Sequence, residues 1–252
     1  MKPRNTSGGG LHLGRLRYSA IELLVALVLL FLVTPFVQNL PYGQAIEVSL
    51  VTLVLVSAIL AIGAHGVRRW IVALLAITAL GARWTDLLFP HALPAGVFHA
   101  AALLFLGYVV LHILRFIFHA PQVNTEVLCA AIAAYLLLGF IWALNYMLVA
   151  RLSPDAFAYS AGPQADRTMN SFNAFYFSFV VLSTVGFGDI TPISNAARML
   201  AVTEALTGLF YITVLISRLV AMYVPATNHA PSPSDSSSNQ PDANPTRTDS
   251  NS

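Results

Sequence analysis

The chain alternates long apolar runs with short polar connections, and the run lengths predict its organisation. A helix needs about 20 apolar residues to cross roughly 30 Å of hydrocarbon. Six runs meet this length, at 21–40, 45–64, 70–89, 95–119, 125–150 and 196–224. A shorter run, 170–183, cannot span and leads directly into a glycine-rich string. We therefore expect an all-α membrane protein with six transmembrane helices and a re-entrant half-helix and loop between the fifth and the sixth.

The polar segments divide the chain further. Residues 1–20 are predicted to be a flexible N-terminal segment, and residues 151–168 a loop outside the membrane. The end of the chain, 225–252, is rich in Pro, Ser, Asn and Asp, a composition typical of disorder. Between these ends we expect a four-helix region at 21–120, followed by a second membrane unit at 121–224.

Arginine placement predicts the orientation in the membrane. An even number of crossings puts both termini on one side, and cytoplasmic flanks collect Lys and Arg. The relevant residues before the first run and between the second and third are Lys2, Arg4, Arg15, Arg17, Arg68 and Arg69. The chain is therefore expected in the cell (inner) membrane, crossing it several times with both termini in the cytoplasm. The first run is too long for a signal peptide and lacks a small-residue cleavage site, so we interpret it as an uncleaved anchor.

Composition agrees with the run lengths. Of the 252 residues, 57% are hydrophobic and 10% charged, and the mean hydropathy is +0.71. The lipid bilayer is thus the expected surroundings. The net charge of +2 includes one lysine and no basic cluster, so nucleic acid is not an expected partner. Cys129 is the one cysteine and is interpreted as a small apolar residue.

The glycine-rich string, residues 184–189, is called the glycine loop below. It reads Thr-Val-Gly-Phe-Gly-Asp and follows the short apolar run. Irregular backbone at membrane depth is tolerated only inside protein or along a watery cavity, and rings of carbonyl oxygens there can replace the hydration shell of a cation. Gly186 and Gly188 allow backbone angles that residues with a Cβ resist. The pattern favours a cation filter, and alanine at either glycine is expected to abolish conduction.

A resemblance to a known family rests on these residues and their neighbours. The chain resembles the tetrameric potassium channel superfamily, in particular its bacterial six-helix members with one pore loop per chain, over about the last hundred residues before the tail. The matching residues are Tyr176, Phe177, Ser178, Ser183, the glycine loop, Pro192, Arg198 and Gly208.

The resemblance implies a pore helix, a selectivity filter and an inner helix. It also implies a homotetramer, because one loop per chain requires three further copies to complete a pore. K⁺ would bind carbonyl oxygens of Thr184, Val185, Gly186 and Phe187, with the Thr184 hydroxyl, and Gly188 completes the filter. The side chains of Val185 and Phe187 are expected to pack outward against the pore helix. K⁺ is then the permeant ion, and no cofactor is expected.

Three residues flank the predicted filter. Asp189 is expected at the outer mouth, bonded to Tyr176 on the pore helix; a simple solvated loop acid is the alternative. The pore helix directs its negative dipole end, near Ser183, toward the central cavity. Phe187 replaces the tyrosine that the family usually has, which keeps a less selective monovalent cation channel open as an alternative.

The last apolar run carries the gating candidates. A stripe at helical spacing either lines an inner vestibule or packs against a neighbouring helix, and its members are Leu209, Ile212, Ile216 and Val220. Gly208 either lets the helix bend or permits close packing. Glu204 is a costly intramembrane acid. One hypothesis is that it braces the filter from behind and that its protonation couples pH to conduction; purely structural bonding is the other.

The fourth run lacks the arginines of a voltage sensor. Between residues 95 and 119 only Arg115 is a permanent cation, accompanied by His112 and His119, so weak or no voltage dependence is expected. Arg83 and Asp86 in the third run are predicted to pair. An enzyme is not expected, because no zinc-spaced His/Glu pair, nucleophile elbow or phosphate loop occurs. The leading hypothesis is a passive potassium channel, with a transporter or membrane enzyme as the last alternative.

Overall fold

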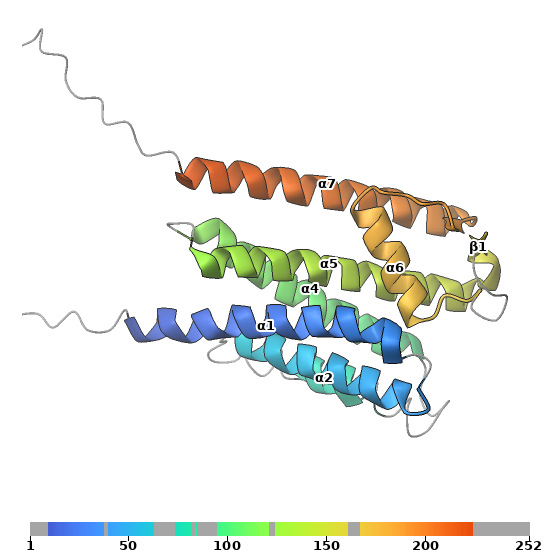
Figure 1. The fold of residues 1–252 in the computed structure, drawn as a ribbon, viewed down its shortest axis with the longest axis horizontal. Helices are drawn as coiled ribbons and strands as arrows, with labels where there is room; N and C mark the ends of the chain where they lie inside the picture. Colours follow the sequence, from blue (N-terminus) through green and yellow to red (C-terminus); the bar gives the residue numbers. More distant parts are fainter. Residues whose placement is uncertain are drawn as a thin grey trace, which may run out of the picture.

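Five long helices form the body of the molecule. The structure is a computed structural model that describes residues 10–37, 40–62, 74–81, 84, 95–120, 124–160 and 167–223. Within these ranges five helices are long and apolar enough to cross a membrane. They are α1 (Gly10–Val37), α2 (Gly43–Ile62), α4 (Ala95–His119), α5 (Thr125–Leu152) and α7 (Asn195–Tyr223). They run side by side along the long axis (Figure 1). The prediction of an all-α membrane protein is confirmed.

The helix bounds follow the apolar runs closely, with one correction. Helix α1 begins at Gly10, so residues 10–19 are helical and not the flexible segment that was predicted. Extending an existing helix costs much less than nucleating one, and the spanning segment supplies the nucleus. Of the third run only 74–81 and 84 are described, and they are helical. The Arg83–Asp86 pair, residues 1–9 and the tail predicted at 225–252 lie outside the described residues.

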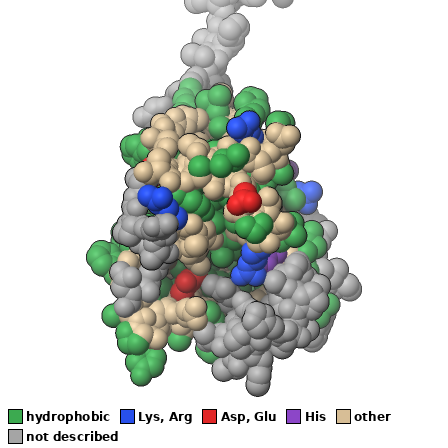
Figure 2. Space-filling model, turned by 90° about the vertical axis from the view of Figure 1, so that its right-hand side faces the viewer, with side chains coloured by type: hydrophobic (Ala, Val, Ile, Leu, Met, Phe, Trp, Pro, Cys, Tyr) green, Lys and Arg blue, Asp and Glu red, His purple; other side chains and the backbone are tan. Residues whose placement is uncertain are grey.

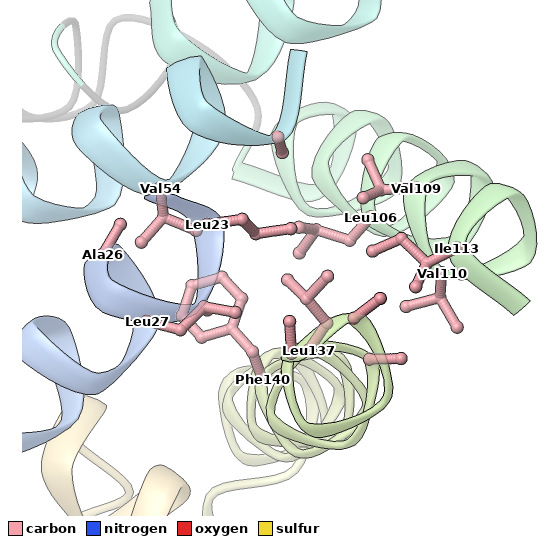
Figure 3. Close-up of a cluster of buried hydrophobic side chains, with 14 of the residues drawn as sticks. Leu23, Ala26, Leu27, Val54, Leu106, Val109, Val110, Ile113, Leu137 and Phe140 are labelled. Atoms are coloured by element: carbon pink, nitrogen blue, oxygen red, sulfur yellow. The ribbon is translucent and has the colours of Figure 1, made fainter. Parts of the chain in front are cut away.

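Helices α1, α2, α4 and α5 share one core (Figure 3). Large side chains interdigitate there, among them Leu23, Val54, Leu106, Val109, Leu137 and Phe140. Small residues on α5 let its backbone approach the neighbouring helices closely. In a membrane such close van der Waals packing, rather than removal of apolar surface from water, stabilises helix association. These small residues are Ala130, Ala131, Ala133 and Ala134, all nearly inaccessible. Helix α5 is therefore a fixed support for the elements that follow it.

A short helix, α6 (Ser171–Leu182), lies obliquely between α5 and α7 (Figure 1). It starts near the end of the molecule that carries strand β1 (Phe157–Tyr159) and runs toward the middle, and the chain then returns to the same end. The start of α1 and the end of α7 both lie at the opposite end (Figure 1). A helix that enters and leaves from one side has the predicted re-entrant geometry.

Two short strands were not predicted. After the turn η1 (Pro154–Ala156), strand β1 pairs antiparallel with β2 (Ile190–Pro192), which directly follows the glycine loop. Tyr159 lies opposite Ile190. Strands of three residues are too short for an alternating pattern to be recognised. Viewed from this end, the described charged side chains are isolated among apolar and uncharged polar ones (Figure 2).

Candidate functional site

Helix α6 is held tightly between its two neighbours. Its start is capped by the Asn170 side chain, which accepts a hydrogen bond of 2.8 Å from the Asn173 amide. A Cβ on Gly139 of α5 would lie 2.5 Å from the Phe179 ring of α6, and a Cβ on Gly208 of α7 would overlap the carbonyl oxygen of Leu182. Glycine at both positions lets α6 approach both helices closely.

This contact bears on the two interpretations of Gly208. Helix α7 continues through Gly208 without a break, and the Leu182 carbonyl occupies the space where a side chain would be. Close packing therefore explains the glycine in this structure. Bending at Gly208 stays a prediction.

The backbone of the glycine loop reverses its φ angle at every second residue. Thr184 has φ 58°, Gly186 60° and Gly188 81°. Glycine takes these values readily, whereas a threonine there costs about 1–3 kcal/mol and is found where the surroundings impose it. In an extended chain successive carbonyls point to opposite sides; a reversal at alternate residues turns them toward one side. Gly186 and Gly188 thus have the positive φ angles that the sequence predicted, and the stacked carbonyl rings stay a prediction.

Hydrogen bonds hold the first three amides of the glycine loop against the end of α6. The Thr184 amide donates to the Val181 carbonyl at 2.8 Å, and the Val185 and Gly186 amides donate to the Val180 carbonyl at 2.9 and 3.4 Å. These bonds satisfy carbonyls at the end of α6 that have no partner within the helix. Among the described residues, nothing donates to the loop carbonyls of Thr184, Val185, Gly186 and Phe187. Three successive loop amides are thus bound to α6, and four successive loop carbonyls have no donor among the described residues.

The loop side chains contact α6 incompletely. The Phe187 ring stacks on the Tyr176 ring, with centroids 6.4 Å apart and planes 6° apart. Yet Phe187 remains 68% exposed and Val185 53% exposed. The expected outward packing is therefore only partial within one chain. Ser183 ends α6, and its hydroxyl donates to the Phe179 carbonyl at 2.6 Å.

Tyr176 and Asp189 are brought together as the sequence suggested. The Tyr176 hydroxyl is hydrogen-bonded to the Asp189 carboxylate. Burial first, and then the hydrogen bond and the charge of Asp189, raise the pKa of Tyr176 to about 12. The phenol is therefore neutral at physiological pH and acts as the donor. This bond ties the end of the glycine loop to α6.

Ser160, which sequence reasoning missed, holds the loop from the other side. Its amide donates to the Asp189 carbonyl at 2.8 Å. Its hydroxyl lies 3.2 Å from the carbonyl oxygens of both Gly188 and Asp189. The Gly188 carbonyl, unlike the four before it, therefore has a partner. No local signal marks Ser160, because the contact depends on the pairing of β1 with β2.

Glu204 is fully buried behind α6. The Tyr146 hydroxyl of α5 donates to its Oε2, and the Ser178 Oγ of α6 lies 2.5 Å from its Oε1. Ser178 Oγ also lies 2.8 Å from the Gly139 carbonyl oxygen of α5. The acid thus connects three helices at the middle of α6, in the place that the bracing hypothesis requires. Tyr146 was not among the predicted residues.

The predicted stripe on α7 does not pack within the chain. Leu209, Ile212, Ile216 and Val220 are between 42% and 56% exposed. Near the end of α7, the Arg218 guanidinium donates to the carbonyls of Phe118 at 2.9 Å and Ala120 at 3.2 Å, where α4 ends. Arg218 is therefore a tie between α7 and the four-helix region, and the stripe is free to face another surface.

Comparison with known proteins places the similarity in this half of the chain. A family model described as "Ion channel" matches residues 126–224. Two pore potassium channel c of Oryza sativa subsp. japonica is 32% identical over 100 residues, which are 38% of this chain and 21% of that protein. No solved structure matches the chain significantly.

Two microbial relatives match over shorter stretches. The voltage-gated potassium channel Kch of Escherichia coli is 40% identical over 52 residues, 21% of this chain and 12% of that protein. The hyperpolarization-activated voltage-gated potassium channel of Methanocaldococcus jannaschii is 42% identical over 50 residues, 20% of this chain and 22% of that protein. The chain thus matches about a fifth or less of the length of these relatives. The resemblance to the potassium channel superfamily is confirmed, and it lies in the membrane unit that contains α5, α6, the glycine loop and α7.

Proposed function

We propose that the protein is a potassium channel that conducts K⁺ passively through a pore lined by the glycine loop. The observation that carries the proposal is the run of four carbonyls, from Thr184 to Phe187, without donors, while the amides of Thr184, Val185 and Gly186 are bound to α6. Oxygens held by hydrogen bonds on their far side can replace the water around a cation without reorganising. The potassium channels among its relatives support K⁺ as that cation.

The pore is a homotetramer in this proposal. The chain has one glycine loop, and the resemblance implies that four such loops surround one axis. Two features of the single chain support assembly. The loop is exposed, although free backbone acceptors cannot face hydrocarbon. Only 11% of the spanning window of α7 is buried, against 50% for α5. Contacts with three further copies would cover the loop and part of α7.

Selectivity for K⁺ over Na⁺ depends on how firmly the loop is held. Phe187 lacks a hydroxyl, and its ring stacks on Tyr176, which binds Asp189. Ser160 holds the carbonyls of Gly188 and Asp189. These ties support a filter of fixed width, and we therefore favour the potassium-selective channel over the weakly selective one.

The remaining proposals concern gating and orientation. Arg115 is the one Lys or Arg of α4, which supports a channel with weak voltage dependence. Arginines lie at both ends of the bundle, for example Arg151 and Arg198 near the glycine loop and Arg115 and Arg218 far from it. The proposal that both chain ends are cytoplasmic therefore rests on the Lys and Arg residues before the first apolar run and between the second and third runs.

Reconstitution tests the function. The purified chain in vesicles loaded with KCl should take up rubidium tracer until the gradient is dissipated, and its mass in detergent should be that of four chains. Tyr176→Phe should still assemble and should lower the preference for rubidium over sodium, because Asp189 loses its partner. Absence of uptake by a tetramer would contradict the proposed conduction, and a monomer would contradict the proposed pore.

A further inference from the structure

The buried contact between Glu204, Ser178 and Tyr146 contains more hydrogen bonds than two hydroxyl protons can supply. Three oxygen pairs lie at bonding distance: Tyr146 Oη with Glu204 Oε2, Ser178 Oγ with Glu204 Oε1, and Ser178 Oγ with the Gly139 carbonyl oxygen. Each pair needs one proton between its two oxygens. The two hydroxyls bring one proton each. The third proton must come from elsewhere.

The direction of each bond follows from the chemistry of its atoms. The Gly139 carbonyl can only accept, so the Ser178 hydroxyl donates to it across 2.8 Å. Ser178 then has no proton left for the carboxyl oxygen 2.5 Å away. The Tyr146 hydroxyl donates to the other carboxyl oxygen. All three bonds are made only if the carboxyl group itself carries a proton on Oε1.

The described surroundings contain no cation that would stabilise the charged form. Glu204, Ser178 and Tyr146 are all inaccessible to solvent. The titratable groups of α5 that face Glu204 are the phenols of Tyr146 and Tyr135, and α6 contributes the Ser178 hydroxyl. Among the described residues, no Lys, Arg or His forms a salt bridge with this acid or contributes to its electrostatic environment. A buried carboxylate without a cation is costly.

We infer that Glu204 is a neutral carboxylic acid that donates to Ser178 and thereby positions α6 against α5 and α7. The inference rests on the proposed function, since it gives Glu204 a task in that pore. Ser178 lies within one turn of Val180 and Val181, whose carbonyls bind the amides of the glycine loop. The acid is thus a positioning residue for the loop, acting through Ser178. A carboxylate in its place would leave one of the three pairs without a proton and would loosen α6.

Infrared difference spectroscopy of the full-length chain at neutral pH tests the protonation. We expect the carbonyl-stretch band of a protonated carboxylic acid in the wild type, and its loss in Glu204→Gln. Asp155→Asn, which alters an exposed acid of η1 outside the spanning helices, should leave the band unchanged and is the matched control. A spectrum in which Glu204→Gln removes carboxylate bands, and no carboxylic acid band, would overturn the inference.

Rubidium uptake tests the positioning. Glutamine offers an amide N–H to Ser178 and an oxygen to Tyr146, so Glu204→Gln should conduct like the wild type, whereas Ser178→Ala should lower uptake by about tenfold. Ser49→Ala removes a hydroxyl that bonds only within α2 and should change nothing. Equal uptake by Ser178→Ala and the wild type would overturn the positioning role. The infrared band does not depend on conduction, so a band without uptake contradicts the proposed function alone, and uptake without the band contradicts this inference alone.

Discussion

Helices α5 and α7 flank the glycine loop on either side and differ in what they contact. Their spanning windows have similar lengths, 28 and 27 residues, yet half of the α5 window is buried inside the chain and only 11% of the α7 window. Helix α5 packs along α1, α4 and α6. Helix α7 meets α6 through Gly208 and Glu204, α5 through Glu204 and Tyr211, and the end of α4 through Arg218. The difference shows that one chain supplies the helices that hold the glycine loop. It leaves the loop itself and most of α7 uncovered.

The largest expected effect on conduction comes from a substitution in the glycine loop, which is exposed in the single chain. A Cβ at Gly186 meets nothing within 4 Å in its own chain, and the residue has φ 60°. Gly186→Ala should therefore leave the fold of the chain intact, at a cost of about 1–2 kcal/mol for the backbone, and should abolish rubidium uptake. Circular dichroism and uptake measured on the same preparation check this. Full uptake by a folded variant would show that the loop does not line the pore.

The next largest effect, on thermal stability, is expected where Gly208 of α7 contacts the end of α6. Gly208→Ala would press a methyl group into the Leu182 carbonyl, whereas Gly139→Ala on α5 meets the Phe179 ring, which has more freedom to move. We expect the α7 variant to lose about 3 kcal/mol and the α5 variant less. Thermal denaturation in detergent measures both. Gly107→Ala, with no neighbour within 4 Å, is the control. A larger loss of stability in the Gly139 variant than in the Gly208 variant would mean that α6 packs more tightly against α5 than against α7.

Much of this comparison could be predicted from sequence, and the limits have physical causes. The apolar runs predict α4 at its observed bounds, and the short run before the glycines predicts α6, because length and hydropathy are local properties. The Tyr176–Asp189 bond came from a resemblance. Ser160 and Tyr146 escaped prediction, since their partners Gly188 and Glu204 are 28 and 58 residues away. The helix over residues 10–19 was not predicted, because their polar and glycine-rich sequence was interpreted as a flexible segment.

A moderate effect is expected at the far end of α7. Arg218→Gln would weaken the two bonds to the carbonyls of Phe118 and Ala120, at a cost of about 1 kcal/mol because the side chain is only half-buried. Hydrogen exchange should then increase at the end of α4 and remain unchanged around Ser178. Arg115→Gln serves as the control on α4 itself. Unchanged exchange at the end of α4 would mean that Arg218 does not tie the two regions.

The smallest effect is expected at the outer end of the loop. Ser160→Ala removes the hydroxyl contacts with the Gly188 and Asp189 carbonyls but keeps the amide bond to Asp189, so the loss should be about 0.5–1 kcal/mol. We expect slightly lower selectivity for rubidium over sodium with unchanged assembly. Ser153→Ala, whose side chain does not cap η1, is the matched control. Identical effects of both variants would exclude a specific role for Ser160.

The central claim is that free carbonyls of the glycine loop replace the hydration shell of potassium. The reversal potential of the purified protein in a planar bilayer, with KCl on one side and NaCl on the other, tests it most directly. The account predicts a large reversal potential with the KCl side negative, because K⁺ crosses the filter far more readily than Na⁺. A reversal potential near zero would contradict it.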